Sequence, residues 1–124
     1  MALRNLGTIT NLQKMTGVLL ATQDANGNPV ALSGLPNPAA DQSQSVSFAN
    51  MTAVPNATPA NSQFTFDIIG TGVSNGAVTI TIQTQQSNGD AGFSQQCQIT
   101  VIEDPSIPGP PAQFVITAGT IVHQ

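Results

Sequence analysis

Hydrophobic and polar residues alternate with a period of two along most of the chain, and helical periodicity is almost absent. In residues 78–83, Val and Ile alternate with Thr and Gln. Residues 93–101 alternate in the same way, and Cys97 falls on the more apolar parity. This pattern turns one face of a strand toward a core and the other toward solvent. It predicts two half-buried strands.

Residues 87–90, Ser-Asn-Gly-Asp, separate these two runs. An Asn-Gly pair readily adopts the positive φ angles of a two-residue hairpin turn. We therefore predict that residues 78–83 and 93–101 pair as an antiparallel β-hairpin.

Shorter runs of the same kind predict the remaining strands, and Gly, Pro and Asn separate them. These runs are residues 17–23, 29–33, 45–49, 64–68, 114–117 and 120–122. Many short strands with such punctuation are typical of a β-sandwich and not of alternating βαβ units. We expect an all-β sandwich of about seven strands.

The N-terminal segment differs from this alternating body. Residues 1–14 contain both basic residues of the chain and look too short to pack independently. We expect an extended N-terminal arm over residues 1–14 that becomes ordered on a partner, or else an ordinary frayed terminus. The sandwich would then cover residues 15–124. The candidate partner-binding residues of the arm are Leu3, Arg4, Leu6, Ile9, Leu12 and Lys14.

Residues 105–111, Pro-Ser-Ile-Pro-Gly-Pro-Pro, predict a stiff extended connector, because proline fixes φ and lacks a backbone donor. The connector separates the last predicted strand, within residues 113–122, from the others. That strand either crosses to the opposite sheet of its own domain or reaches a neighbouring chain. Phe114 and Ile116, on one face of it, are further candidates for contact with a partner.

Three segments, 64–72, 76–82 and 93–101, resemble bacterial immunoglobulin-like modules in their strands and turns. Residues 24–30, Asp-Ala-Asn-Gly-Asn-Pro-Val, are similar to a turn that is frequent in that superfamily. The resemblance implies an immunoglobulin-like β-sandwich and says little about activity. The chain has no Trp, no Tyr and no cysteine pair, so it lacks the Trp–disulfide core of antibody domains.

Only 6% of the 124 residues are charged, and the formal net charge is −4. Two basic residues cannot neutralise many phosphates, and no apolar run approaches the length of a membrane span, so we expect neither nucleic acid nor membrane as a partner. Uncharged strand faces lose little hydration free energy when they are buried. A chain with almost no Lys also lacks the charges that usually protect sheet edges against pairing with other chains. We expect a protein partner, or further copies of the chain, to cover these faces and edges. The alternative is a composition that reflects the host or a protease-rich environment.

The residues that carry catalytic chemistry are scarce. His123 is the only imidazole and lies beside the C-terminus, and one His with one Cys cannot form a zinc site. Residues 24–28 begin like a calcium loop, but Gly27 falls at the fourth position and Leu35 at the twelfth. A turn is favoured there, and a weak calcium site is the alternative. We expect no enzyme activity, no cofactor, no metal and no small-molecule substrate.

Immunoglobulin-like modules occur in bacterial surface proteins and in phage virion proteins, including capsid decoration proteins. The chain starts with Met and has no apolar run of signal-peptide length, so we expect synthesis in the host cytoplasm. The resemblance then implies a virion structural protein, a homo-oligomeric capsid decoration protein that binds the major capsid protein. One alternative is an extracellular or cell-surface adhesin, filament or pilus-type module that uses strand donation. Another is a small accessory module that binds calcium or a glycan.

Overall fold

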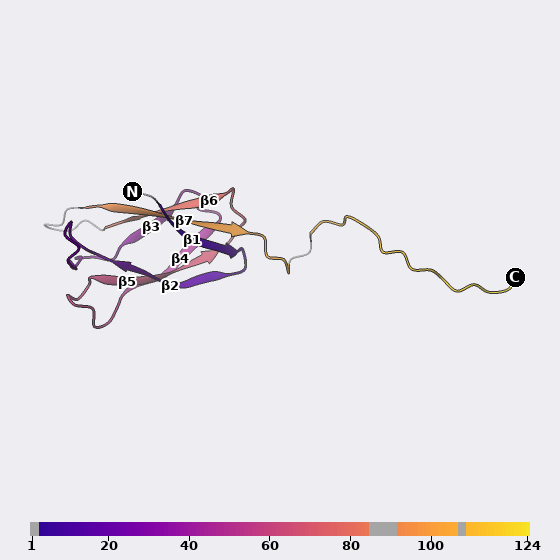
Figure 1. Ribbon diagram of the computed structural model, residues 1–124, viewed down its shortest axis with the longest axis horizontal. Helices are drawn as coiled ribbons and strands as arrows, with labels where there is room; N and C mark the ends of the chain where they lie inside the picture. The colour runs from indigo at the N-terminus through magenta and orange to yellow at the C-terminus, as the bar shows by residue number, and fades with distance from the viewer. Residues whose placement is uncertain (1–2, 85–91, 107–108) are drawn as a thin grey trace.

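The protein is described by a computed structural model that covers residues 3–84, 92–106 and 109–124. Seven strands form two sheets in these ranges, and the predicted all-β sandwich is confirmed (Figure 1). No helix among the described residues is long and apolar enough to cross a membrane. The strands are β1 (Arg4–Thr10), β2 (Lys14–Ala21), β3 (Asn37–Ala40), β4 (Val46–Ala53), β5 (Gln63–Gly70), β6 (Ala77–Gln83) and β7 (Ser94–Ile102).

One sheet has the order β1-β7-β6-β3 and the other has the order β2-β5-β4. The pairing of β1 with β7 is parallel, and all other neighbours in these sheets are antiparallel. Only β4–β5 and β6–β7 are consecutive strands of the same sheet, so the other connections cross between the sheets. This alternation between layers places residues of both sheets in a common core.

The core lies between β5 of one sheet and β6 and β7 of the other. The inward face of β5 carries Phe64, Phe66 and Ile68, each at most 1% exposed. Opposite them, β6 and β7 contribute side chains that are fully buried, namely Val78, Ile80, Ile99 and Val101. Burial of each such side chain stabilises the fold by about 1.5–3 kcal/mol. The inward parity that the sequence predicted for these three strands is confirmed.

The pairing predicted for residues 78–83 and 93–101 is also confirmed. β6 and β7 run antiparallel over the whole length of β6, with Ile80 opposite Cys97. At the end of this hairpin that leads toward the predicted turn, Thr84 N donates a hydrogen bond to Phe93 O (3.1 Å). The predicted turn over residues 87–90 lies outside the described residues.

The prediction of a separate N-terminal arm is wrong in the part of residues 1–14 that the structure describes. β1 is hydrogen-bonded to β7 with Arg4 opposite Cys97, and Ile9 is buried in the core. Lys14 begins β2. The N-terminal segment therefore belongs to the sandwich, because its apolar side chains complete the core beside β7.

The sandwich also ends earlier than predicted, at β7. Residues 109–124 form an exposed tail without strand structure, and it extends away from the sandwich (Figure 1). The strands predicted at 114–117 and 120–122 are absent, because no neighbouring strand supplies hydrogen-bond partners there. Residues 29–33 form only an isolated bridge, Gln23 with Pro29, and β3 is the strand that follows β2.

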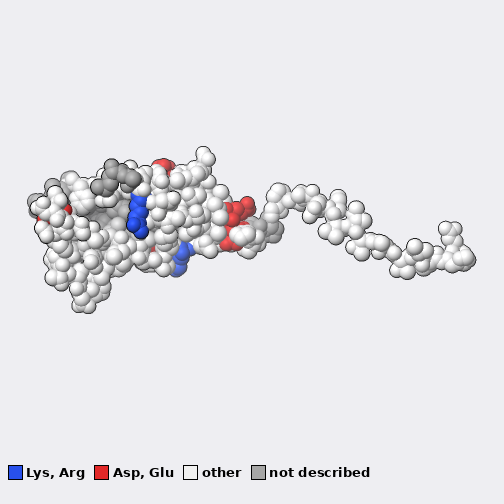
Figure 2. All heavy atoms as spheres, viewed as in Figure 1, with Lys and Arg blue, Asp and Glu red and all other residues white. Residues whose placement is uncertain are grey.

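Charged side chains are few on the visible face of the sandwich and absent from the visible tail (Figure 2). Acidic atoms gather where the tail leaves the sandwich, after β7 (Figure 2). The sequence places Glu103 and Asp104 at this point. The structure thus consists of a nearly uncharged sandwich and an uncharged, extended tail.

Candidate functional site

A groove opens between the two sheets, on the side where β1 and β2 form their edges. Its volume is about 250 Å³. Apolar cavities of about 150 Å³ can hold a benzene molecule, so the groove has room for an aromatic side chain. Its apolar lining is formed by Leu6, Val18, Leu19, Leu20, Ala21, Leu32, Pro36, Ile82, Phe93 and Cys97.

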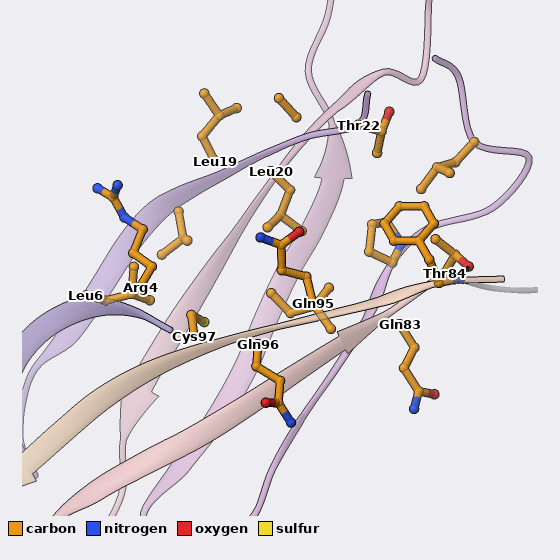
Figure 3. Close-up of a pocket in the computed structure, with 16 residues that line it drawn as sticks. Arg4, Leu6, Leu19, Leu20, Thr22, Gln83, Thr84, Gln95, Gln96 and Cys97 are labelled. Carbon is orange, nitrogen blue, oxygen red and sulfur yellow. Dashed lines mark hydrogen bonds between the residues drawn. The ribbon is translucent and has the colours of Figure 1, made fainter. Parts of the chain in front are cut away.

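The side chains of the groove come from facing strands (Figure 3). Leu20 of β2 points toward Gln95 of β7, whereas Leu19 points away from β7 and is 57% exposed. Arg4 is the basic residue of the lining. Burial raises the pKa of the Cys97 thiol, which therefore stays neutral and behaves as a small apolar side chain. The groove is thus suited to an apolar occupant.

β2 borders the groove and pairs only with β5 among the described strands. Thr22, just after β2, donates its backbone N–H to Ser62 O (2.9 Å) on the β5 side. Because backbone groups alternate in direction along an antiparallel strand, Leu19 directs its N–H and C=O away from β5. The edge of β2 therefore presents backbone groups that an added strand could use.

A β-bulge interrupts three of the four edge strands. The register shifts between Asn5 and Thr8 in β1, between Met15 and Val18 in β2, and between Ala49 and Thr52 in β4. Gly7, Gly17 and Asn50 have φ angles of 110°, 70° and 62° at these bulges. Bulges and short strands protect sheet edges against pairing with other chains. The fourth edge, β3, has only four residues and includes Pro38.

Asp67 of β5 connects two of these bulges. Its Oδ2 accepts a hydrogen bond from Asn50 Nδ2 (2.8 Å), and its Oδ1 accepts one from Gly17 N (3.1 Å). The Asn50 bond, the Gly17 bond and the nearby charge of Lys14 hold the pKa of Asp67 below its usual value. The carboxylate thereby fixes the bulges of β2 and β4 and leaves Val18–Ala21 as the regular stretch of β2.

The tail is the most exposed apolar segment of the described chain. Phe114 and Ile116 are 93% and 91% exposed, and Val115, Ile121 and Val122 are also exposed. Residues 109–124 contain no Asp, Glu, Lys or Arg. Large exposed apolar side chains that follow one another in this way mark sites of interaction.

The predicted partner-binding residues are divided among several places in the fold. Arg4 and Leu6 line the groove, and Phe114 and Ile116 lie in the tail. Ile9 is 6% exposed and belongs to the core, so it is not accessible to a partner. Leu3, Leu12 and Lys14 are exposed outside the groove lining. The sequence reasoning missed Leu19 and Leu20, although the apolar run 18–21 was visible as a signal.

The segment that resembles a calcium loop is a tight turn. Asp24 Oδ1 accepts hydrogen bonds from the backbone N–H groups of Asn26 and Asn28, both at 2.9 Å. These bonds, the Asn28 backbone bond above all, hold the pKa of Asp24 below its usual value. No group of three or more His, Cys, Asp or Glu residues in the described ranges could hold a metal ion. His123, the one imidazole, lies in the exposed tail.

Comparison of the chain with protein-family models, with curated proteins and with solved structures finds no match.

Proposed function

We propose that this protein is a non-enzymatic structural protein of a phage virion, a capsid decoration protein that binds the major capsid protein and reinforces the shell. The observation that carries the proposal is the uncharged apolar tail, which is fully separate from the core of a small sandwich. Exposed apolar segments of this kind are used for association and not for stability of the monomer. Assembly in the host cytoplasm and residence in the virion follow from this role.

The strand order supports an immunoglobulin-like sandwich within this proposal. Constant-type immunoglobulin domains have strands A, B, E and D in one sheet and C, F and G in the other. β2, β5 and β4 take the order of B, E and D, and β3, β6 and β7 take the order of C, F and G. β1 lies beside β7 and not beside β2, so among the described residues the three-stranded sheet has no strand in the position of A.

The mechanism of the proposed function is mechanical. Strand faces rich in Thr, Gln, Ser and Asn lose little hydration energy when they are covered by a neighbouring subunit, in contrast to charged faces. A sandwich that binds the shell and also contacts further copies through its tail would engage several subunits at once. Such multivalent binding raises the overall affinity without stronger individual contacts.

The test is co-sedimentation of the purified protein with shells assembled from the major capsid protein that the same genome encodes. We expect saturable binding in a fixed ratio to the shell subunits, and no binding to shells of an unrelated capsid protein. Equal recovery with both kinds of shell, or recovery with neither, contradicts the proposal.

A second candidate is an extracellular adhesin, filament or pilus-type module that uses strand donation. The unpaired tail and the open edge of β2 favour it, because strand donation needs both a free strand and a free edge. Electron microscopy of the concentrated protein distinguishes the two candidates. Long unbranched filaments of a protein that does not bind the shells support the second candidate, and shell binding supports the first.

A further inference from the structure

We propose that residues 114–117 of one molecule add as a strand to the free edge of β2 in a second molecule, with Phe114 and Ile116 in the groove. This inference names the contact behind the homo-oligomer of the proposed function and rests on it to that extent. The occupant is a second copy of this chain, and the place of contact is Val18–Ala21.

Phe114 and Ile116 of the tail carry apolar, uncharged side chains, which suit the apolar lining of the groove. In an extended strand, Phe114 and Ile116 share one face and Val115 and Thr117 share the other. The groove is lined mainly by apolar side chains and has room for an aromatic ring. The tail brings no Asp, Glu, Lys or Arg into the contact, so no charge of that kind has to be desolvated.

Of the two strand edges beside the groove, the edge of β2 is the one with which a short strand can pair. The bulge at Gly17 ends just before Val18, and the register with β5 is regular from Val18 to Ala21. A donated strand of four residues matches this stretch. β1, the other edge strand beside the groove, is interrupted by its bulge at Gly7. The added strand would occupy the position that is empty next to β2 in the three-stranded sheet.

The tail leaves the sandwich at the end remote from the groove entrance. β7 begins beside Phe93, which lines the groove, and runs to Ile102 before the tail starts. Pro105, Pro110 and Pro111 favour an extended backbone, and the described tail, residues 109–124, lies away from the sandwich (Figure 1). Eight residues, 105–112, would span about 25 Å in a polyproline conformation. This direction favours a neighbouring molecule over the groove of the same molecule.

A contact between the tail of one molecule and the groove of the next is a head-to-tail contact. Such contacts close into a ring when the rotation between molecules permits and otherwise form open filaments. Every copy has one donor tail and one acceptor groove. The donor and acceptor functions can therefore be removed separately, in full-length chains.

The experiment uses two full-length variants. The donor-deficient variant carries Phe114→Ser and Ile116→Ser, both in the exposed tail. The acceptor-deficient variant carries Leu19→Pro, which removes a backbone donor that points away from β5. Ala21→Lys, which places a charge at the same exposed edge, replaces Leu19→Pro if that variant melts early. Matched controls are Val115→Ser with Thr117→Ser in the tail and Val73→Lys, whose exposure of 55% is close to that of Leu19.

We expect each deficient variant to be monomeric in native mass spectrometry and an equimolar mixture of the two to form a one-to-one heterodimer. The wild type and both controls should form larger assemblies. In the heterodimer only the groove of the donor-deficient chain is occupied. Reaction of its Cys97 with a thiol reagent should therefore be about tenfold slower in the mixture than in that variant alone. Cys97 of the acceptor-deficient chain should react at the same rate in both samples.

Three outcomes overturn the inference: a wild type that stays monomeric, deficient variants that assemble like the wild type, or a mixture in which Cys97 of the donor-deficient chain reacts no more slowly. Shell binding by a protein that fails these tests leaves the proposed function standing and removes only the strand donation. A protein that forms the heterodimer but does not bind shells would contradict the proposed function and leave the strand donation standing.

Discussion

Thr10 and Asp104, 94 positions apart in sequence, are joined by a hydrogen bond of 2.8 Å from Thr10 Oγ1 to Asp104 Oδ2. Next to it, Asp104 N donates to Asn11 Oδ1 (2.9 Å). These bonds attach the first residues after β7 to the end of β1. The point at which the tail leaves the sandwich is therefore fixed by the N-terminal strand.

The lowered pKa values of three aspartates predict how the stability of the fold depends on pH. Hydrogen bonds to Ser106 and Thr10 lower the pKa of Asp104, and the pKa values of Asp24 and Asp67 are lowered as well, from an ordinary value of 3.8. A carboxyl whose folded pKa lies below its unfolded pKa stabilises the fold above the unfolded value, and this stabilisation is lost as the pH falls through the folded value. We expect the urea concentration at the unfolding midpoint to decrease once the pH falls below about 4.

Asp67→Asn tests this explanation at one site. The variant keeps the side-chain size but removes the titrating group that joins the bulges of β2 and β4. Its urea midpoint should be lower than that of the wild type at pH 7, and the difference should shrink as the pH approaches 3 or so. A difference that grows at low pH would contradict the role assigned to Asp67.

Ile9→Ala tests whether β1 belongs to the core. Ile9 is 6% exposed, and its truncation leaves a cavity, so we expect a loss of about 2–5 kcal/mol in the free energy of unfolding. Leu12→Ala is the matched control, because Leu12 is 65% exposed and should change stability by less than about 0.5 kcal/mol. Equal changes in the free energy of unfolding for Ile9→Ala and Leu12→Ala would contradict the place of β1 in the core.

Gly70→Ala tests the close approach of β5 to the turn between β1 and β2. A Cβ at Gly70 would collide with the backbone oxygen of Thr10 and lie 3.1 Å from that of Gln13, to which Gly70 N donates (2.8 Å). Because backbone atoms cannot give way cheaply, we expect destabilisation by about 1–3 kcal/mol. Gly119→Ala meets nothing within 4 Å and should leave the urea midpoint unchanged. A Gly70→Ala variant as stable as Gly119→Ala would contradict the close approach of β5 to this turn.

The sequence predicted the central strands because their side chains alternate without interruption. Phe64, Phe66 and Ile68 in β5 are the clearest case, and their burial is confirmed. The pairing of β6 with β7 was also predictable, since both strands alternate and an Asn-Gly pair lies between them in the sequence.

The edge strands were harder to predict because of their bulges. Across each bulge, two apolar residues three positions apart both pack against the core, which breaks the period of two. The pairs are Leu6 with Ile9, Met15 with Val18, and Phe48 with Met51. For this reason the sequence predicts an arm where β1 lies and places the start of β2 three residues too late, at Gly17. β3 was missed because Asn-Pro-Ala-Ala has little strand propensity.

The tail shows the opposite discrepancy. Residues 114–117 have a strand-forming sequence, but a strand needs a partner as well as a suitable sequence, and the described part of the chain supplies none. The groove could not be predicted, since it depends on which strands lie at the sheet edges. Scarce Lys and Arg suggested unprotected edges, whereas the structure protects most of them with bulges.

The central claim is that the tail serves association and contributes nothing to the stability of the sandwich. Sedimentation equilibrium and urea unfolding of the full-length chain, compared with a variant that ends at residue 111, test it most directly. We predict assemblies well above the monomer mass of 12.7 kDa for the full chain, a monomer for the shortened chain and the same urea midpoint for the dilute monomers of both. A shortened chain that unfolds, or a full-length chain that stays monomeric at every concentration, would contradict this claim.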